Sequence, residues 1–520
     1  MTNSGLRRVS FSRPVQPRGE AVESKLSALK ERLLEVYDLR AASAVLEWDQ
    51  TTYMPSAAGK TRARQIRTLR HLAHERFTDP GVGELLDTLR PYVEDLPYES
   101  DEASLVRVTR RDYERATRVP SEFMAEYHSH VADSYQAWVK ARPADDFAAM
   151  VPYLEKMVDL SRQFADFFPG YESVADPIID YFAHEGYSAS EVQSIFADLR
   201  EQLVPIAEAI AEAPEPEDDF LYRSFPRDDQ LAFGLKVVET FGYDLDRGRQ
   251  DLTHHPFTTT FSTGDVRITT RVNENDLRSA LFATLHEGGH ALYEQGVRRE
   301  LEGTPLARGT SAGAHESQSR LWENLVGRSR GFWEAFYPLL QDRFSEQLGT
   351  ISLEEFYAAI NKVEPSLIRV EADEVTYNLH VMLRFDLEQD LLEGRLEVAD
   401  VADAYRARFE QDLGIAPPDD RDGVLRDMHW FGHFLGAGYL GYTLGNTMSA
   451  QFFEAAVRER PHITDEIRDG IFGSLHGWLR EKVYGHGRKF TAPELLVRVT
   501  GGPLTVEPYV DYLKDKYGAL

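Results

Sequence analysis

The sequence predicts a mainly α-helical fold with one small β-sheet, on three observations. Apolar residues recur at helical spacing along most of the 520 residues, as where Leu26, Leu29 and Leu33 fall on one face of residues 23–39. Residues 255–272 instead combine threonine, phenylalanine and valine around a Ser-Thr-Gly-Asp centre, which is typical of a β-hairpin. The content of 42% hydrophobic and 28% charged residues is that of a globular protein.

The first elements in chain order are a tail and a series of helices. Residues 1–22 contain arginines but no apolar run, so they are expected to form a flexible tail and not a secretion signal. An acidic, proline-rich stretch at 211–220 is expected to be a surface connection. We therefore interpret residues 23–520 as one domain, with an N-terminal helical part to about residue 215 and a catalytic part from about 216 onward. Helical periodicity is clearest in residues 23–39, 60–75, 101–140, 150–168 and 188–212.

A further helix is expected directly after the hairpin, within residues 273–296. Asn275 or Asp276 is a suitable N-cap, and Gly296 is a suitable end. This segment contains two consecutive glycines, each of which costs a helix interior roughly 1 kcal/mol relative to alanine. Their presence at positions 288 and 289 therefore predicts a need for space, either around a bound ion or against a neighbouring element.

The same helix carries a pattern that favours metal chemistry. His286 and His290 lie about one helical turn apart, so both rings can face one ion, and Glu287 can act on a water beside that ion as a general base. Without cysteine in the chain, disulfides, thiolate ligands and cysteine nucleophiles are excluded, and a third ligand has to be a histidine or a carboxylate. Glu316, in the next helical pattern at 314–327, is the natural source. The alternative is a surface helix with two solvated histidines and an unrelated surface glutamate.

A hairpin that runs into such a helix is also the arrangement expected of a zinc peptidase, in which an edge strand beside the metal can pair with an extended peptide. Several further motifs follow in order, and through them the chain resembles the carboxypeptidase Taq family of metallocarboxypeptidases over about residues 23–520. One position departs from the family pattern, because Arg426 stands where that family usually has glutamine. The motifs are residues 46–65, His255-Pro256-Phe257, Asp265-x-Arg267-x-Thr269, His286-Glu287-Gly288-Gly289-His290, His315-Glu316-Ser317-Gln318, Ile368-Arg369-x-x-Ala372-Asp373 and Asp427-x-His429-Trp430.

The resemblance implies a large helical metallopeptidase fold with a deep active-site cleft, partly roofed by N-terminal helices, and a small sheet beside the metal helix. It also implies that Glu316 completes a zinc site with His286 and His290, with Co²⁺ able to substitute for Zn²⁺. His315, next to Glu316, is either a support for the ligands or a packed helix residue. Broad side-chain preference, poor acceptance of C-terminal proline and a homodimer are further implications of the family.

The remaining functional residues are expected to bind the substrate. Arg369 has the planar fork that pairs best with a free C-terminal carboxylate, although an ion pair with Glu371 or Asp373 is the alternative. Peptide hydrolysis also places a negative charge on the oxygen of the attacked carbonyl group, the oxyanion. We expect His429, Tyr439 or Tyr442 to donate a hydrogen bond to it. Arg267 either lines the cleft and contacts substrate or, together with Thr269, orders the edge strand.

The predicted function is therefore a cytoplasmic metallocarboxypeptidase that releases C-terminal amino acids from peptides. One alternative is a zinc oligopeptidase or dipeptidyl carboxypeptidase of the same helical class, and a more distant one is a non-catalytic peptide-binding scaffold with structural zinc. The net charge of −28 disfavours nucleic acid as a partner. No apolar run approaches the roughly 18 residues that a membrane span requires.

Overall fold

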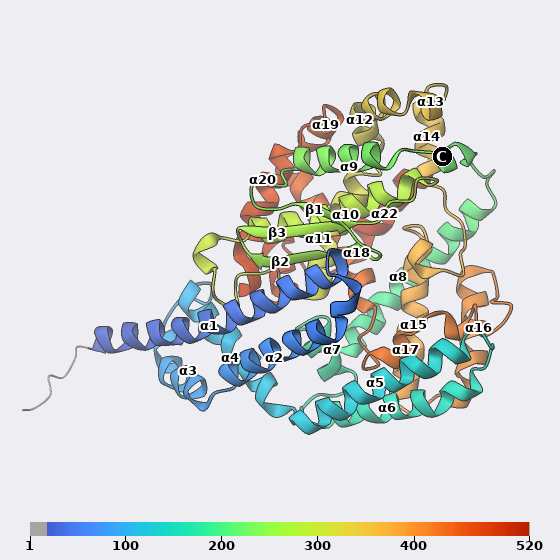
Figure 1. Ribbon diagram of the computed structural model, residues 1–520. Helices are drawn as coiled ribbons and strands as arrows, with labels where there is room; N and C mark the ends of the chain where they lie inside the picture. The colour runs from blue at the N-terminus through green and yellow to red at the C-terminus, as the bar shows by residue number, and fades with distance from the viewer. Residues whose placement is uncertain (1–17, 519–520) are drawn as a thin grey trace, which may run out of the picture.

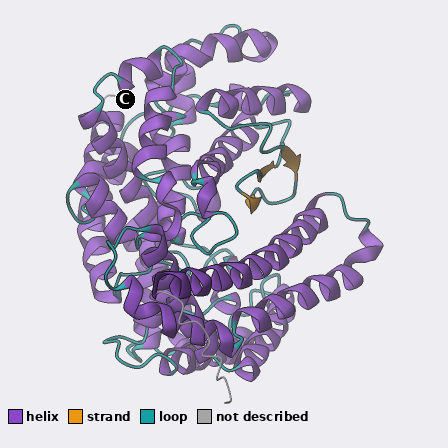
Figure 2. Cartoon of the chain, turned by 90° about the vertical axis from the view of Figure 1, so that its left-hand side faces the viewer, coloured by secondary structure: helices purple, strands orange, loops and turns teal. Residues whose placement is uncertain are grey.

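The computed structural model describes residues 18–518, and it confirms the mainly α-helical fold. Helices make up most of the described chain, and the strands among residues 18–518 form one three-stranded sheet beside them (Figures 1 and 2). The first nine helices, which include all the helical stretches predicted above, are α1 Arg18–Thr52, α2 Gly59–Phe77, α3 Pro80–Val93, α4 Asp101–Arg118, α5 Ser121–Ala141, α6 Val151–Asp166, α7 Asp176–Phe182, α8 Ala189–Ala211 and α9 Arg227–Phe241.

Thirteen α-helices follow the sheet in the described part of the chain. None of the helices in residues 18–518 is long and apolar enough to cross a membrane. These later helices are α10 Leu277–Gly296, α11 Ala312–Arg320, α12 Arg330–Arg343, α13 Ser345–Leu348, α14 Leu353–Ile360, α15 Tyr377–Leu392, α16 Val401–Leu413, α17 His429–Gly432, α18 Leu440–Glu459, α19 Ile463–Arg468, α20 Gly473–Lys482, α21 Ala492–Thr500 and α22 Glu507–Tyr517.

The sheet contains the predicted hairpin and one additional strand. Strands β2 (Thr258–Ser262) and β3 (Asp265–Thr270) pair in antiparallel fashion and turn through positions 263 and 264, as expected. Strand β1 (Gln250–Leu252) pairs with β3 in parallel, which gives the order β1-β3-β2. A three-residue strand whose partner lies in a separate segment leaves no periodic signal, which is why β1 was not predicted. Strand β2 is consequently an edge of the sheet.

Helix α10 follows the hairpin and begins and ends where the sequence predicts. The side chain of Asp276 caps it by accepting a hydrogen bond from the backbone N–H of Arg278, and its last residue is Gly296. The glycine pair allows close packing on both sides. A Cβ atom at Gly289 would lie 2.6 Å from the carbonyl oxygen of Gln318, and one at Gly288 would lie 2.6 Å from Val238. The backbones of α10 and α11 therefore approach more closely than any larger residue would allow.

Helix α11 continues into an unpredicted π-helical segment, η5 (Leu321–Val326). The sequence analysis expected one regular helix through residues 314–327. Apolar spacing over only six residues does not distinguish a π turn from an α turn, so the sequence carried no marker for it. Such segments are frequent at functional sites, and this one carries Glu323, whose role is described below.

One of the N-terminal helices lies next to the sheet. Helix α1 runs beside β2 (Figure 1), and a second apolar core joins the first four helices to Val297, Leu301 and Leu306, just after α10. The predicted tail at residues 1–22 falls mostly outside the described part of the chain, and residues 18–22 begin α1. The connection at 211–220 is largely exposed, as expected.

Candidate active site

Three predicted ligands converge between α10 and α11. The Nε2 atoms of His286 and His290 lie 3.8 and 3.7 Å from the same carboxylate oxygen, Oε2 of Glu316. The three donor atoms all lie within 4.8 Å of one another. Two imidazole nitrogens and one carboxylate oxygen around a common point form a donor set that suits a divalent ion such as zinc, with room for a further ligand. The side chains therefore fit the metal that the sequence predicts.

Each histidine is oriented by a hydrogen bond from its other nitrogen. Nδ1 of His286 donates to Glu323, over 2.9 Å. Nδ1 of His290 lies 2.7 Å from Nδ1 of His315, and Nε2 of His315 lies 2.7 Å from Oε1 of Glu294.

The carboxylate at the end of this chain determines where the protons lie. Interaction with His315 lowers the pKa of Glu294 against the opposing effect of burial, so that Glu294 is charged and can only accept. A neutral His315 that donates from Nε2 to Glu294 accepts at Nδ1 from His290. The Nε2 lone pair of His290 is left facing Glu316, which is the form that a metal ion requires. His315 therefore supports a ligand and is not merely a packed helix residue.

Arg320 links the two carboxylates that serve these histidines. Its Nε donates to Glu316 over 2.8 Å, and its Nη1 donates to Glu323 over 3.2 Å. Burial raises the pKa of Glu323, but the charge of Arg320 and the hydrogen bond from His286 outweigh burial and lower that pKa to about 2. Glu323 is thus a fixed negative charge behind His286.

Glu287 faces the edge strand. Its Oε2 accepts a hydrogen bond of 2.7 Å from the hydroxyl of Thr258 on β2, and only 6% of the residue is exposed. Burial raises the pKa of Glu287, and the opposing effects of His286 and the Thr258 hydrogen bond are smaller. A buried carboxylate with a raised pKa has the basicity that proton transfer from water requires.

A cleft of about 960 Å³ opens over these residues. Its walls come from α1, from β2 and from the segment that begins α18, so α1 forms part of the roof, as expected. Thr258 and Thr260 of β2 line it together with all three ligands, Glu287, Tyr439 and Tyr442.

Arg369 lies behind this wall in a cage of tyrosines. It belongs to a short helical turn, η6 (Arg369–Glu371), and its guanidinium carbon lies 4.2 Å above the ring of Tyr439 and 5.5 Å from that of Tyr442. Nη1 of Arg369 donates to the hydroxyl of Tyr377 over 2.8 Å. Its buried Nε has no hydrogen-bond partner and lies 3.8 Å from Asp427. The predicted alternative, a close ion pair with Glu371 or Asp373, is not formed among the described residues.

The three candidates for the oxyanion donor occupy different environments. Asp427 accepts from both the ring of His429 and the hydroxyl of Tyr439. His429 has 43% of its side chain exposed and does not line the cleft. Tyr442 does line the cleft, and burial followed by the nearby charge of Glu316 raises its pKa, so its hydroxyl stays protonated.

Arg267 lies within the sheet and does not itself line the cleft. Its guanidinium makes two hydrogen bonds of 2.8 Å to Asp265 and lies 4.4 Å from the ring centre of Trp48 on α1. The structure thus brings Arg267 together with α1 and not with the ligands. Arg426, the departure from the family motif, pairs with Asp422 over 3.0 Å.

Sequence analysis missed the residues that support the ligands. Glu294, Arg320 and Glu323 were not identified, and neither was Thr258. Their positions carried a partial signal, because Glu294 lies four residues after His290 and Arg320 four after Glu316, on the same helix faces. The contacts between helices, which give these residues their roles, have no sequence signature.

Replacing Glu323 with glutamine is expected to weaken metal binding by about 10- to 100-fold, because the partner of a histidine ligand sets the ring's orientation and basicity. The affinity should be measured by competition with a chelator of known strength. Glu346→Gln, the same change at an exposed carboxylate on α13, serves as the control. Equal affinities in Glu323→Gln and the parent would contradict the assigned role.

Comparison with known proteins agrees with this geometry. The sequence profile of the family described as "Carboxypeptidase Taq (M32) metallopeptidase" matches residues 28–517. Thermostable carboxypeptidase 1 of Thermus thermophilus is 41% identical over 96% of this chain and 99% of its own length. Carboxypeptidase 1 of Bacillus subtilis is 35% identical over 92% and 95%. The crystal structure of an M32 carboxypeptidase from Deinococcus radiodurans superposes with a TM-score of 0.92 at 51% identity, covering 95% of this chain and 99% of that one.

Proposed function

The chain belongs to the carboxypeptidase Taq (M32) metallopeptidase family, and from this premise we propose that His286, His290 and Glu316 hold the divalent ion of its active site. It is a metallocarboxypeptidase acting on peptides. The observation that carries the residue assignment is the convergence of two Nε2 atoms on one oxygen of Glu316. The ion, when bound, supplies Lewis-acid activation of the attacking water and the scissile carbonyl.

Glu287 acts as the general base. It takes a proton from the attacking water and returns it to the amine that leaves. Its burial supports this role, because the raised pKa makes the carboxylate a stronger proton acceptor. The Thr258 hydroxyl holds one carboxylate oxygen toward β2, which leaves the other oxygen to receive the proton.

Tyr442 is the preferred donor to the oxyanion. Its position on the cleft wall supports this choice over His429, and the nearby Glu316 together with burial keeps its hydroxyl protonated. Tyr439 already donates to Asp427, and His429 shares that same carboxylate. We assign those two residues to positioning the loop that leads into α18.

Arg369 recognises the carboxylate at the substrate's C-terminus. The surrounding tyrosines hold its guanidinium in place. Its Nε has no hydrogen-bond partner and is therefore free to donate to a substrate carboxylate. Since Tyr439 and Tyr442 stand between Arg369 and the cleft, these rings have to adjust when the carboxylate binds. Arg267 is assigned to ordering β3 against α1.

The substrate lies along β2 as an added strand. This edge of the sheet carries Thr258 and Thr260 on the cleft wall, so an extended peptide can pair with it while its last bond reaches Glu287. Main-chain pairing favours broad side-chain preference. It also disfavours a C-terminal proline, which has no N–H to donate. Zinc is the expected native metal, with cobalt able to substitute, and a cytoplasmic homodimer is the expected form.

Product analysis distinguishes this function from its alternatives. Incubation with a free-acid peptide is expected to release single C-terminal residues in sequence, detected by mass spectrometry, whereas the amidated peptide is cut poorly. Dipeptide products would identify a dipeptidyl carboxypeptidase, and equal internal cleavage of both peptides an oligopeptidase. If the metal-loaded protein hydrolysed neither peptide, the remaining alternative would be a non-catalytic scaffold that binds peptides.

A further inference from the structure

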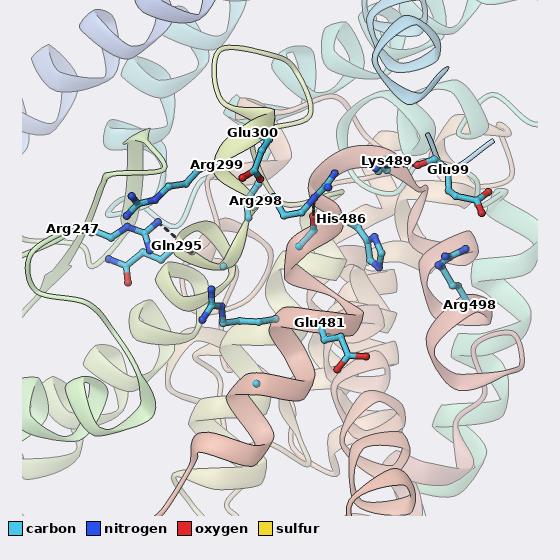
Figure 3. Close-up of a pocket in the computed structure, with 15 residues that line it drawn as sticks. Glu99, Arg247, Gln295, Arg298, Arg299, Glu300, Glu481, His486, Lys489 and Arg498 are labelled. Atoms are coloured by element: carbon cyan, nitrogen blue, oxygen red, sulfur yellow. Dashed lines mark hydrogen bonds between the residues drawn. The ribbon is translucent and has the colours of Figure 1, made fainter. Parts of the chain in front are cut away.

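A second cavity, of about 770 Å³, lies at the C-terminal end of α10, the helix that carries His286 and His290 (Figure 3). Its walls are the last turn of α10 with the residues that follow it, helix α20, and the turn η9 (Tyr484–Lys489). The catalytic cleft shares none of its lining residues with this cavity. Its volume is typical of a site for a small molecule.

Basic side chains dominate the cavity, although the protein as a whole has a net charge of −28. Only three glutamates line it, and Glu481 among them pairs outward with Arg460 and Lys482. Six cationic side chains line the cavity, together with His486, whose pKa burial lowers to about 4: Arg247, Arg298, Arg299, Arg480, Lys489 and Arg498.

No salt bridge among residues 18–518 is formed by four of these arginines: Arg247, Arg299, Arg480 and Arg498. By contrast, neighbouring Arg298 and Lys489 both pair with Asp101. Arg247 donates only to the backbone carbonyls of Thr263 and Gln295, and Figure 3 shows it beside Arg299.

The guanidinium of Arg247 lies close enough to those of Arg299 and Arg480 to be repelled by both. Burial lowers the pKa of Arg247, and the charges of Arg299 and Arg480 lower it further, whereas Asp244 and Glu302 act in the opposite direction. In a chain with 86 acidic and 58 basic side chains, carboxylates to neutralise such a cluster are plentiful. These arginines instead line the cavity, and an anion that enters it would reduce the repulsion between Arg247 and its two neighbours further.

We propose that this cavity binds a ligand bearing a chain of phosphate groups, such as a nucleoside triphosphate or a free oligophosphate. Several arginine forks around one space match the tetrahedral, multiply charged groups of such a ligand, which can accept two hydrogen bonds from each fork. The cavity volume exceeds what a single small anion needs. Arg247 also connects the site to the last turn of α10, through Gln295.

Calorimetry on the full-length, metal-loaded protein tests this, with tripolyphosphate and ATP as separate probes at about 0.15 M salt. We expect saturable binding of one ligand per chain that weakens as salt is raised. Equal affinities would assign recognition to the phosphate chain alone, and tighter binding of ATP would add a contact to the nucleoside. The metal content is measured before and after titration, so that chelation is separated from binding.

The double variant Arg299→Ala/Arg480→Ala is expected to weaken binding by about 100-fold or more. Its matched control is Arg64→Ala/Arg67→Ala, which removes the same charge from exposed positions on α2 and should bind as the parent does. Peptide hydrolysis is expected to be unchanged in both, so failure here is separable from failure of the proposed function.

Four results would overturn the proposal. They are absence of binding by both probes, equal weakening in the control variant, equally tight binding of citrate, and a change of oligomeric state in Arg299→Ala/Arg480→Ala without any ligand binding. The last would identify the cluster as a contact between chains.

Discussion

Replacing Glu287 with glutamine is expected to lower kcat by about 10²- to 10⁴-fold, the usual loss when a general base is removed. Glutamine has the same size and can still accept a hydrogen bond from Thr258, so the edge strand and α10 should stay in place. The amide has no significant basicity, however, and proton transfer from water fails. The metal ligands are untouched, and the metal content should equal that of the parent.

Hydrolysis of a free-acid peptide and metal analysis of the same preparation are the two measurements required. Glu346→Gln makes the same chemical change at an exposed position and should be fully active. Loss of metal together with activity would mean that Glu287 supports the ligands and not the proton transfer. Full activity would assign the base to another residue.

Replacing Arg369 with alanine is expected to reduce kcat/KM for free-acid peptides by about 100-fold or more. A fork that pairs with a carboxylate contributes roughly 1.5–3 kcal/mol per hydrogen bond, and about 1.4 kcal/mol corresponds to each factor of ten. Arg369→Lys should recover only part of the loss, because an ammonium keeps the charge but not the planar pair of donors. Amidated peptides, which are poor substrates for the parent, should be nearly indifferent to either change.

The difference between acid and amide substrates makes this test specific. Removing Arg369 also empties the cage formed by Tyr377, Tyr439 and Tyr442, so thermal unfolding has to be followed in parallel. Arg395→Ala, at an exposed arginine on the loop after α15, controls for loss of one positive charge. Equal losses on both substrates, or a large fall in melting temperature, would assign Arg369 to structure and the carboxylate contact elsewhere.

Features of the fold that depend on local sequence were predictable. The turn through Gly264, the cap at Asp276 and the end of α10 at Gly296 each rest on a few adjacent residues. The close spacing of His286 and His290 likewise follows from one helical turn. The glycine pair indicated a need for space, although only the structure identifies α11 as the neighbour that requires it.

Features that depend on contacts between distant segments were not predictable. Nothing near Glu323 in the sequence indicates that it meets His286, because their contact is made between α10 and the π-helical segment. The chain from Glu294 through His315 to His290 also requires two helices at a fixed separation. Arg267 illustrates the same limit, since its packing on Trp48 of α1 joins residues far apart in the sequence.

The most direct test of the central claim is a crystal structure of the metal-loaded protein with the C-terminal amino acid product bound. We expect one divalent ion, with Nε2 of His286 and His290 and an oxygen of Glu316 all at about 2.0–2.2 Å from it. We also expect the product carboxylate within hydrogen-bond distance of Arg369. An ion bound without Glu316, or a product carboxylate held away from Arg369, would contradict this claim.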